Sequence, residues 1–173
     1  ISREKITHLN SWFAFPIHVF IDTQIYINES YNFNTRGNLG YLRKHIRDGK
    51  VHHLSSEVVV GEVERHIKKD VSEAIGSFNK VVDDRRLAIF RDKKYRQLQQ
   101  LDEEIMVTEA VSIFHTYLSE TKAFMLSIDT IDLPSVISDY FEAKAPFGIK
   151  KDKKSEFPDA FNLSMLRKYA AHN

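Results

Sequence analysis

Residues 17–26 constrain the fold of this chain more than any other segment. They read Ile-His-Val-Phe-Ile-Asp-Thr-Gln-Ile-Tyr, an apolar, β-branched run that stops at one carboxylate, Asp22. Such a run is typical of a buried strand in a parallel sheet, so we expect the first strand around residues 17–21. Ligands of open parallel sheets bind beyond the carboxyl ends of the strands, where Asp22 would lie. An Asp can also end a strand merely because it starts a turn, so Asp22 alone leaves both interpretations open.

The order of the later segments indicates an α/β fold. After a loop over residues 29–38, the pattern predicts a helix at 39–47 that ends at Asp48-Gly49, a strand at 51–54, and a long helix capped by Ser55 or Ser56. Further on it predicts a strand at 123–128, a helix from Pro134 to about 143 and a last helix from 155–158 onward. This alternation predicts a parallel sheet with helices on both faces.

A largely helical block over residues of about 68–121 interrupts the alternation. Two apolar stripes at helical spacing define it, and the stretch between them is dominated by charged residues. The first stripe comprises Val59, Val63, Ile67, Val71, Ala74 or Ile75, Phe78 and Val82, and the second comprises Ile105, Val107, Val111, Phe114, Tyr117 and Leu118.

Length and composition limit the class of protein. The 173 residues fit one domain, residues 1–173, which needs no disulfides and has no cysteine to form them. No secretory signal is visible, and the most apolar window, residues 12–27, is too short and polar to span a bilayer, so we expect a cytoplasmic protein without membrane contact. The chain begins at Ile1 and ends in a helical pattern, so we expect a fragment truncated at its C-terminus. The 25 basic residues balance 24 acidic ones, so net charge indicates no partner.

Two more carboxylates join Asp22 as candidates for chemistry. Glu62 falls on the border of the first stripe, although it could instead face solvent and pair with Arg65 or His66. Asp159 lies in the first turn of the last helix, where the helix dipole favours any carboxylate. Carboxylates without a cysteine or histidine motif suit Mg²⁺ or Mn²⁺, and such ions support the hydrolysis of phosphodiesters. Metal-assisted hydrolysis is therefore the predicted reaction.

These acidic residues occur, in order, within three short motifs. The motifs are Phe-Ile-Asp-Thr at 20–23, Leu-Ser-Ser-Glu-Val-Val-Val-Gly-Glu-Val at 54–63 and Glu-Phe-Pro-Asp-Ala-Phe at 156–161. Together they resemble the PIN-domain nucleases, from about residue 17 to the end of the chain. The Ala-Pro-Phe-Gly run at 145–148 and the lysine-rich loop after it look most like the larger bacterial PIN-like domains with a helical insertion.

The resemblance implies a three-layer α/β/α sandwich, Mg²⁺ or Mn²⁺, and endonucleolytic cleavage, usually of single-stranded RNA. It implies that Asp22, Glu62 and Asp159 are catalytic metal ligands, that Glu156 is a further metal ligand, and that Thr23 supports Asp22. Contacts to nucleic acid would come from Thr23, Lys150, Lys151, Lys153 and Lys154. Members of the family usually carry a fourth strand and a further acidic residue, which would lie in a further segment or domain beyond residue 173. An inhibitor protein is a partner that the family also implies.

Several alternatives stay open at this point. The four lysines could be an exposed, solvated loop, and the basic residues around residues 85–96 could be either an arm that follows RNA or a solvated helix face. A haloacid dehalogenase phosphatase would need a second Asp where Gln24 stands, and the acidic pair and late lysine of a receiver domain are not evident. The main rival is an inactive PIN-like module that binds RNA or docks a protein. His52, His53 and His66 lack zinc-ligand spacing and are expected on the surface or in packing.

Overall fold

The computed structural model describes residues 16–90, 99–148 and 153–173. Its main elements are β1 (Ile17–Phe20), α2 (Thr23–Asn28), α3 (Asn38–Arg47), β2 (Val51–Ser56), α4 (Glu57–Val82), α5 (Glu103–Glu120), β3 (Phe124–Leu126), α6 (Leu133–Phe141) and α7 (Phe157–Ala170). Short 3-10 turns occur at η2 (Arg85–Phe90), η4 (Ile128–Thr130) and η5 (Lys153–Glu156). The expected order of the strands and the longer helices is confirmed, and the short helix α2 was not expected. The sequence also predicts a lead-in helix or irregular segment over residues 1–15, which lies outside the described residues.

The three strands form one parallel sheet in the order β1-β2-β3. In the register, Phe20 lies opposite Leu54, and Leu54 lies opposite Phe124. The predicted parallel sheet is therefore confirmed. The first strand is less buried than its apolar run suggests, because Ile17 is 41% exposed and the neighbouring His18 is exposed too.

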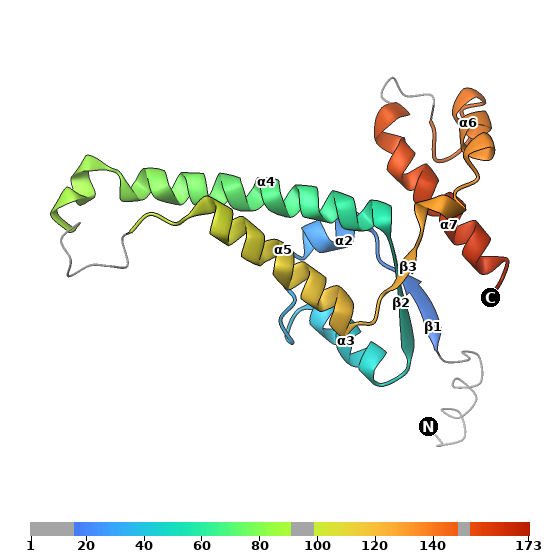
Figure 1. Cartoon of the computed structure of the whole chain (residues 1–173), viewed down its shortest axis with the longest axis horizontal. Coiled ribbons are helices and arrows are strands. Elements are labelled where there is room, and N and C mark those ends of the chain that lie inside the picture. The colour runs from blue at the N-terminus through green and yellow to red at the C-terminus, as the bar shows by residue number, and fades with distance from the viewer. Residues whose placement is uncertain (1–15, 91–98, 149–152) are drawn as a thin grey trace, which may run out of the picture.

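Helices cover both faces of the sheet (Figure 1). Successive side chains of β2 point to opposite faces. On one face His52 stacks on His18, with ring centroids 5.0 Å apart, and Tyr169 of α7 lies 2.9 Å from His18 Nδ1. On the other face, the His53 ring reaches Thr121 at the end of α5, with Nδ1 and Oγ1 2.8 Å apart. The three-layer α/β/α arrangement follows from this division.

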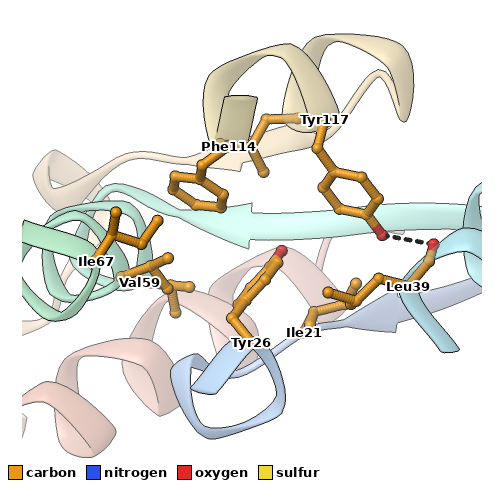
Figure 2. Packing of buried hydrophobic residues seen from close by; sticks show 9 residues of the cluster. Ile21, Tyr26, Leu39, Val59, Ile67, Phe114 and Tyr117 are labelled. Atoms are coloured by element: carbon orange, nitrogen blue, oxygen red, sulfur yellow. Dashed lines mark hydrogen bonds between the residues drawn. The ribbon is translucent and has the colours of Figure 1, made fainter. Parts of the chain in front are cut away.

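The main core lies between the sheet and helices α2, α3, α4 and α5 (Figure 2). Tyr26 and Phe114 meet edge to face, with ring centroids 5.3 Å apart, and Tyr117 donates a hydrogen bond to the backbone oxygen of Leu39 at 3.1 Å. Figure 2 shows Ile21 at the end of β1 turned into this cluster. The core thus fixes the point at which the chain leaves β1. A second, smaller cluster joins α6 to α7 and contains Val136, Phe147 and Ala160.

The helices α4 and α5 pack together into a hairpin that extends away from the sheet (Figure 1). Of the predicted stripes, Val59, Val63, Ile67, Ile75, Val82, Phe114, Tyr117 and Leu118 are buried. Phe78 and Ile105 are instead 37% and 62% exposed, because two paired helices can bury only the stripe that faces the partner. Helix α4 runs unbroken through residue 68. The helical block expected from about residue 68 therefore begins inside this helix and not at a boundary between elements. None of the described helices is long and apolar enough to cross a membrane.

Candidate active site

Asp22 lies just beyond the carboxyl end of β1, where the sequence predicted it. The backbone N–H of Ile21 still donates to the Leu54 oxygen of β2, at 3.3 Å, so the sheet fixes the chain up to the residue before Asp22. Asp22 is then the N-cap residue of α2, but its side chain makes no capping hydrogen bond. The half-buried carboxylate is therefore not used in capping the helix.

Thr23 links this corner to α4. Its hydroxyl donates a hydrogen bond of 2.9 Å to Glu62 Oε2, and its side chain is buried. Glu62 is half-buried in the second turn of α4. The alternative pairing of Glu62 with Arg65 or His66 is not observed, and Arg65 instead lies 3.1 Å from His66 Nε2. Thr23 was expected to support Asp22 and to contact nucleic acid, whereas the recorded hydroxyl bond is to Glu62.

The pKa of Asp159 is affected by the charges of the other acidic residues. It lies in the first turn of α7, one turn after Glu156, the N-cap residue of that helix. The pKa of Asp159 is raised, first by partial loss of hydration and then by the negative charges of Asp22, Glu156 and Glu62. The N-terminus of a helix would by itself favour the ionised form, so repulsion and desolvation outweigh the helix dipole here. Carboxylates from three distant segments of the chain therefore lie within electrostatic reach of Asp159.

A buried hydrogen bond holds α4 against α7 beside these carboxylates. Ser56 is the N-cap of α4, where its Oγ accepts from the Val59 N–H at 3.1 Å, and it donates to Asn162 Oδ1 at 2.6 Å. Both side chains are buried, and Asn162 Nδ2 has no hydrogen-bond partner among the described residues. Sequence reasoning identified Ser56 only as one of two possible caps and overlooked Asn162. A polar residue between the apolar Phe161 and Leu163 was the available signal.

Glu57, the first residue of α4, makes a contact at the same edge of the sheet. Its Oε2 accepts a hydrogen bond from the Ile128 N–H at 2.8 Å, which ties the turn after β3 to the start of α4. Sequence reasoning placed Glu57 only in the first helical turn, where its charge is favourable. Glu57 therefore has a structural partner, and it is not among the three carboxylates that raise the pKa of Asp159.

The donor set suits a hard divalent cation, but the carboxylates are not closely clustered. Within residues 16–90, 99–148 and 153–173, no three acidic or histidine side chains lie close enough together to hold an ion by themselves. Mg²⁺ keeps several of its waters and is commonly held by only one or two carboxylates. The residues present therefore fit an ion bound partly through water.

The lysine-rich loop is only partly visible. Lys150 and Lys151 lie outside the described residues, and Lys153 begins the turn η5. Lys154 is exposed in the same turn, two residues before Glu156. Lys154 is thus the one lysine of the set whose side-chain exposure the structure describes. Of the predicted basic cluster near residues 85–96, Arg86 is exposed and paired with Asp84, and residues 91–98 lie outside the described part.

The largest of the recorded cavities is not at the carboxylates. It measures about 530 Å³, lies between α6 and α7, and is lined by residues that include Asp132, Asp139 and Arg167. None of its lining residues is Asp22, Glu62, Glu156 or Asp159. The carboxylates instead lie where α2, α4 and α7 begin, and Asp22 and Glu62 follow the carboxyl ends of β1 and β2, the edge at which ligands of parallel sheets bind.

Comparison with protein families decides the assignment. A family model described as "PIN domain" matches residues 19–173, well over half of the chain. The chain belongs to the PIN-domain family. PIN domains are generally nucleases and typically use divalent metals, so this match agrees with the carboxylate chemistry described above. Comparisons with curated proteins and with solved structures each found no match.

Proposed function

We propose that this PIN domain is a metal-dependent endonuclease that hydrolyses phosphodiester bonds of RNA with Mg²⁺ or Mn²⁺. The observation that carries the proposal is the environment of Asp159, whose pKa is raised first by partial loss of hydration and then by the charges of Asp22, Glu156 and Glu62. Like charges at this range are unfavourable unless a cation neutralises them. A site that keeps four such residues near one another is therefore suited to binding a divalent ion.

The side chains have separate roles in this proposal. Asp22, Glu62 and Asp159 would hold the ion, with Glu156 beside them. Thr23 fixes one oxygen of Glu62 through its hydroxyl, so the remaining lone pairs of that carboxylate stay oriented. Exposed Lys154 lies where it can meet a phosphate of the substrate. When bound, a divalent ion lowers the pKa of a coordinated water and neutralises charge on the phosphate.

The first test is Mn²⁺-dependent cleavage of labelled single-stranded RNA, with single-stranded DNA in parallel. Asp22→Asn should lower the cleavage rate by at least about 100-fold, the order of the loss when one electrostatic stabiliser is removed from an active site. Asp48→Asn is the matched control, because Asp48 is an exposed carboxylate at the end of α3, before the amino end of β2. Full activity of Asp22→Asn would remove Asp22 from the site.

An inactive PIN-like module that binds RNA or docks a protein is the second candidate. It is favoured by the lack of three closely placed ligand side chains in the described part of the chain. Thermal unfolding with and without Mn²⁺ separates the two candidates, because an ion that binds only the folded state must stabilise it. At an ion concentration of 100 times Kd the gain is about 2.7 kcal/mol, which corresponds to roughly 5–10 °C in Tm for a domain of this size.

Thermal unfolding at different pH values provides a control for the Mn²⁺ measurement. A carboxyl whose folded pKa is raised adds stability at low pH, and that stability is lost as pH rises through the folded pKa. In the absence of metal, Asp22→Asn should therefore melt above the wild type at pH 7, and the difference should shrink toward pH 4 and at high salt. In Mn²⁺ the order should reverse. No Mn²⁺ response in the wild type would favour the docking module.

A further inference from the structure

One face of α4 carries basic side chains in line with Glu62. At 100° per residue, Lys69 and Lys80 fall within about 20° of Glu62 around the helix axis, and Arg65 and Gly76 fall within about 60°. Apolar residues that enter the core from the distal half of α4, such as Ile75 and Val82, point to the opposite side. The four residues Arg65, Lys69, Gly76 and Lys80 are called the α4 basic face below.

The cations of the α4 basic face are available to a ligand. Arg65, Lys69 and Lys80 are all exposed. Lys69 has an ion pair with Glu73, at 3.9 Å, and the two side chains are 62% and 69% exposed, so this contact is weak. Beyond Glu62, two acids lie on this side of α4, Glu73 and the C-cap residue Asp83, and the three cations accompany them. This part of the face therefore carries one net positive charge and is open to water.

The backbone of α4 is also accessible along this line. A Cβ added at Gly76 would meet no atom within 4 Å, so a ligand can approach the helix closely at that point. Lys80 follows Glu62 by 18 residues, which places it roughly 27 Å farther along the helix. Figure 1 shows α4 running from its contact with α7 out along the hairpin. The residues of the α4 basic face thus lie at increasing distance from Glu62 along the helix, toward the far end of the hairpin.

We propose that the α4 basic face binds the phosphate backbone of a single-stranded nucleic acid on one side of the bond to be cleaved. The part of this inference that places the bound nucleic acid next to the cleaved bond rests on the proposed nuclease function. Binding of the nucleic acid to the α4 basic face needs no metal. Cations spaced along a line suit a polyanion, and most protein–nucleic acid hydrogen bonds go to phosphate and sugar. A docked protein would instead need an apolar centre, and the exposed Phe78 and Val81 lie about 160° and 100° from Glu62 around α4.

The test measures binding of labelled oligouridylate by fluorescence anisotropy over a range of salt, without divalent metal. The variant is Arg65→Gln, Lys69→Gln and Lys80→Gln together. The control is Lys44→Gln, Arg47→Gln and Lys50→Gln, which removes the same charge from exposed residues before the amino end of β2. Each phosphate contact contributes about 0.7 to the slope of log K against log salt for a single strand, so the α4 variant should lose a slope of about 2. The control should keep the wild-type slope.

The length of the strand gives a second readout. Wild-type protein should bind a long oligouridylate more tightly than one too short to reach Lys80 from Glu62, and Lys80→Glu alone should remove that difference. In cleavage assays the α4 variant should raise KM for long substrates with little change in kcat. An unchanged salt slope, an equal loss in the control variant, or equal competition by polyglutamate would overturn the proposal.

The two proposals fail in different ways. A wild-type protein that binds oligouridylate through the α4 basic face and cleaves nothing would contradict the nuclease function and leave this binding site standing. A protein that cleaves RNA in an Asp22-dependent manner, with the same salt slope in wild type and α4 variant, would contradict the binding site alone. Circular dichroism of each variant establishes that the substitutions, all at exposed positions, leave the fold intact.

Discussion

His53 is a polar side chain that the core keeps neutral. It is 1% exposed on β2, between Tyr26 of α2 and Thr121 at the end of α5. The hydroxyl of Thr121 donates to the backbone oxygen of Tyr117, at 2.9 Å, so it must accept from His53, and Nδ1 is the protonated nitrogen. Nε2 then accepts from the Tyr26 hydroxyl at 3.3 Å. A second proton on the ring would leave that hydroxyl without its acceptor.

The burial of His53 makes stability depend on pH. Desolvation lowers its pKa from 6.5 to about 4. The unfolded chain therefore takes up a proton on this residue between pH 6.5 and 4 while the folded chain does not, and stability falls as pH falls through this window, by up to about 3 kcal/mol. Urea unfolding at pH 7 and pH 4.5 should show a smaller pH-dependent loss in His53→Asn than in wild type.

The matched control for this prediction is His52→Asn on the same strand. His52 is exposed on the other face of the sheet, so its ring stays in contact with water in the folded chain. Its replacement should leave the pH dependence of unfolding as in wild type. Equal pH dependence in His53→Asn and wild type would contradict the assignment of a neutral, buried imidazole.

Helix α3 depends on a glycine for its packing, and α4 contains a glycine that has no such contact. A Cβ on Gly40 would lie 2.1 Å from the backbone oxygen of Asn34, in the loop before α3. A Cβ on Gly61 would meet no atom within 4 Å. The same substitution, glycine to alanine inside a helix, therefore has opposite consequences in the two elements.

We expect Gly40→Ala to destabilise the protein by about 1–3 kcal/mol, because the loop must move to relieve the clash. Gly61→Ala should stabilise it by up to about 1 kcal/mol, because alanine has the higher helix propensity. Chemical denaturation of the two variants measures both values. A stabilised Gly40→Ala protein would show that the loop at Asn34 is not held against α3.

The helix α2 is the element that the sequence pattern concealed. The sequence predicts a strand at residues 17–21 and a loop from residue 29, but no element between them, and the structure starts a helix at Thr23. Two apolar residues of this helix, Ile25 and Tyr26, lie on different sides, with Ile25 46% exposed and Tyr26 fully buried. A helix of six residues contains too few turns to establish a period, so only the packing of Tyr26 into the core reveals it.

At the scale of the whole molecule, the position of the acidic site depends on the contact between α4 and α7. Ser56 and Asn162 are 106 positions apart in the chain, and their hydrogen bond of 2.6 Å is buried at this contact. Glu62 follows Ser56 on α4, and Asp159 precedes Asn162 on α7. The geometry of the acidic site therefore depends on how these two helices meet.

Ser56→Ala should cost about 2–4 kcal/mol, of which about 1 is the lost helix cap and the rest is an unsatisfied buried amide on Asn162. Asn162→Leu should cost less, because Nδ2 already has no partner among the described residues. Urea unfolding of the two single variants and the double variant should show a coupling of about 1–2 kcal/mol. Additive losses would mean that the hydrogen bond adds nothing. Ser77→Ala, an exposed serine of α4, is the control and should change stability by less than about 0.5 kcal/mol.

Local sequence patterns were enough to predict the parallel sheet and the order of every main element except α2. Periodicity and end signals suffice for this, as the glycine end of α3 at Gly49 and the cap of α4 at Ser56 illustrate. The family match over residues 19–173 agrees with the motifs around Asp22, Glu62 and Asp159. These are properties of neighbouring residues, which a local pattern can encode.

Which side chains meet across the molecule depends on how the helices pack in three dimensions. The bond from Thr23 to Glu62 spans 39 positions, and the effect of Asp22 on the pKa of Asp159 spans almost the whole described chain. A linear pattern assigns a residue to one face of its own helix but does not specify the partner across the contact. That choice belongs to the packing of α4 against α2 and α7, where burial and hydrogen bonding act together.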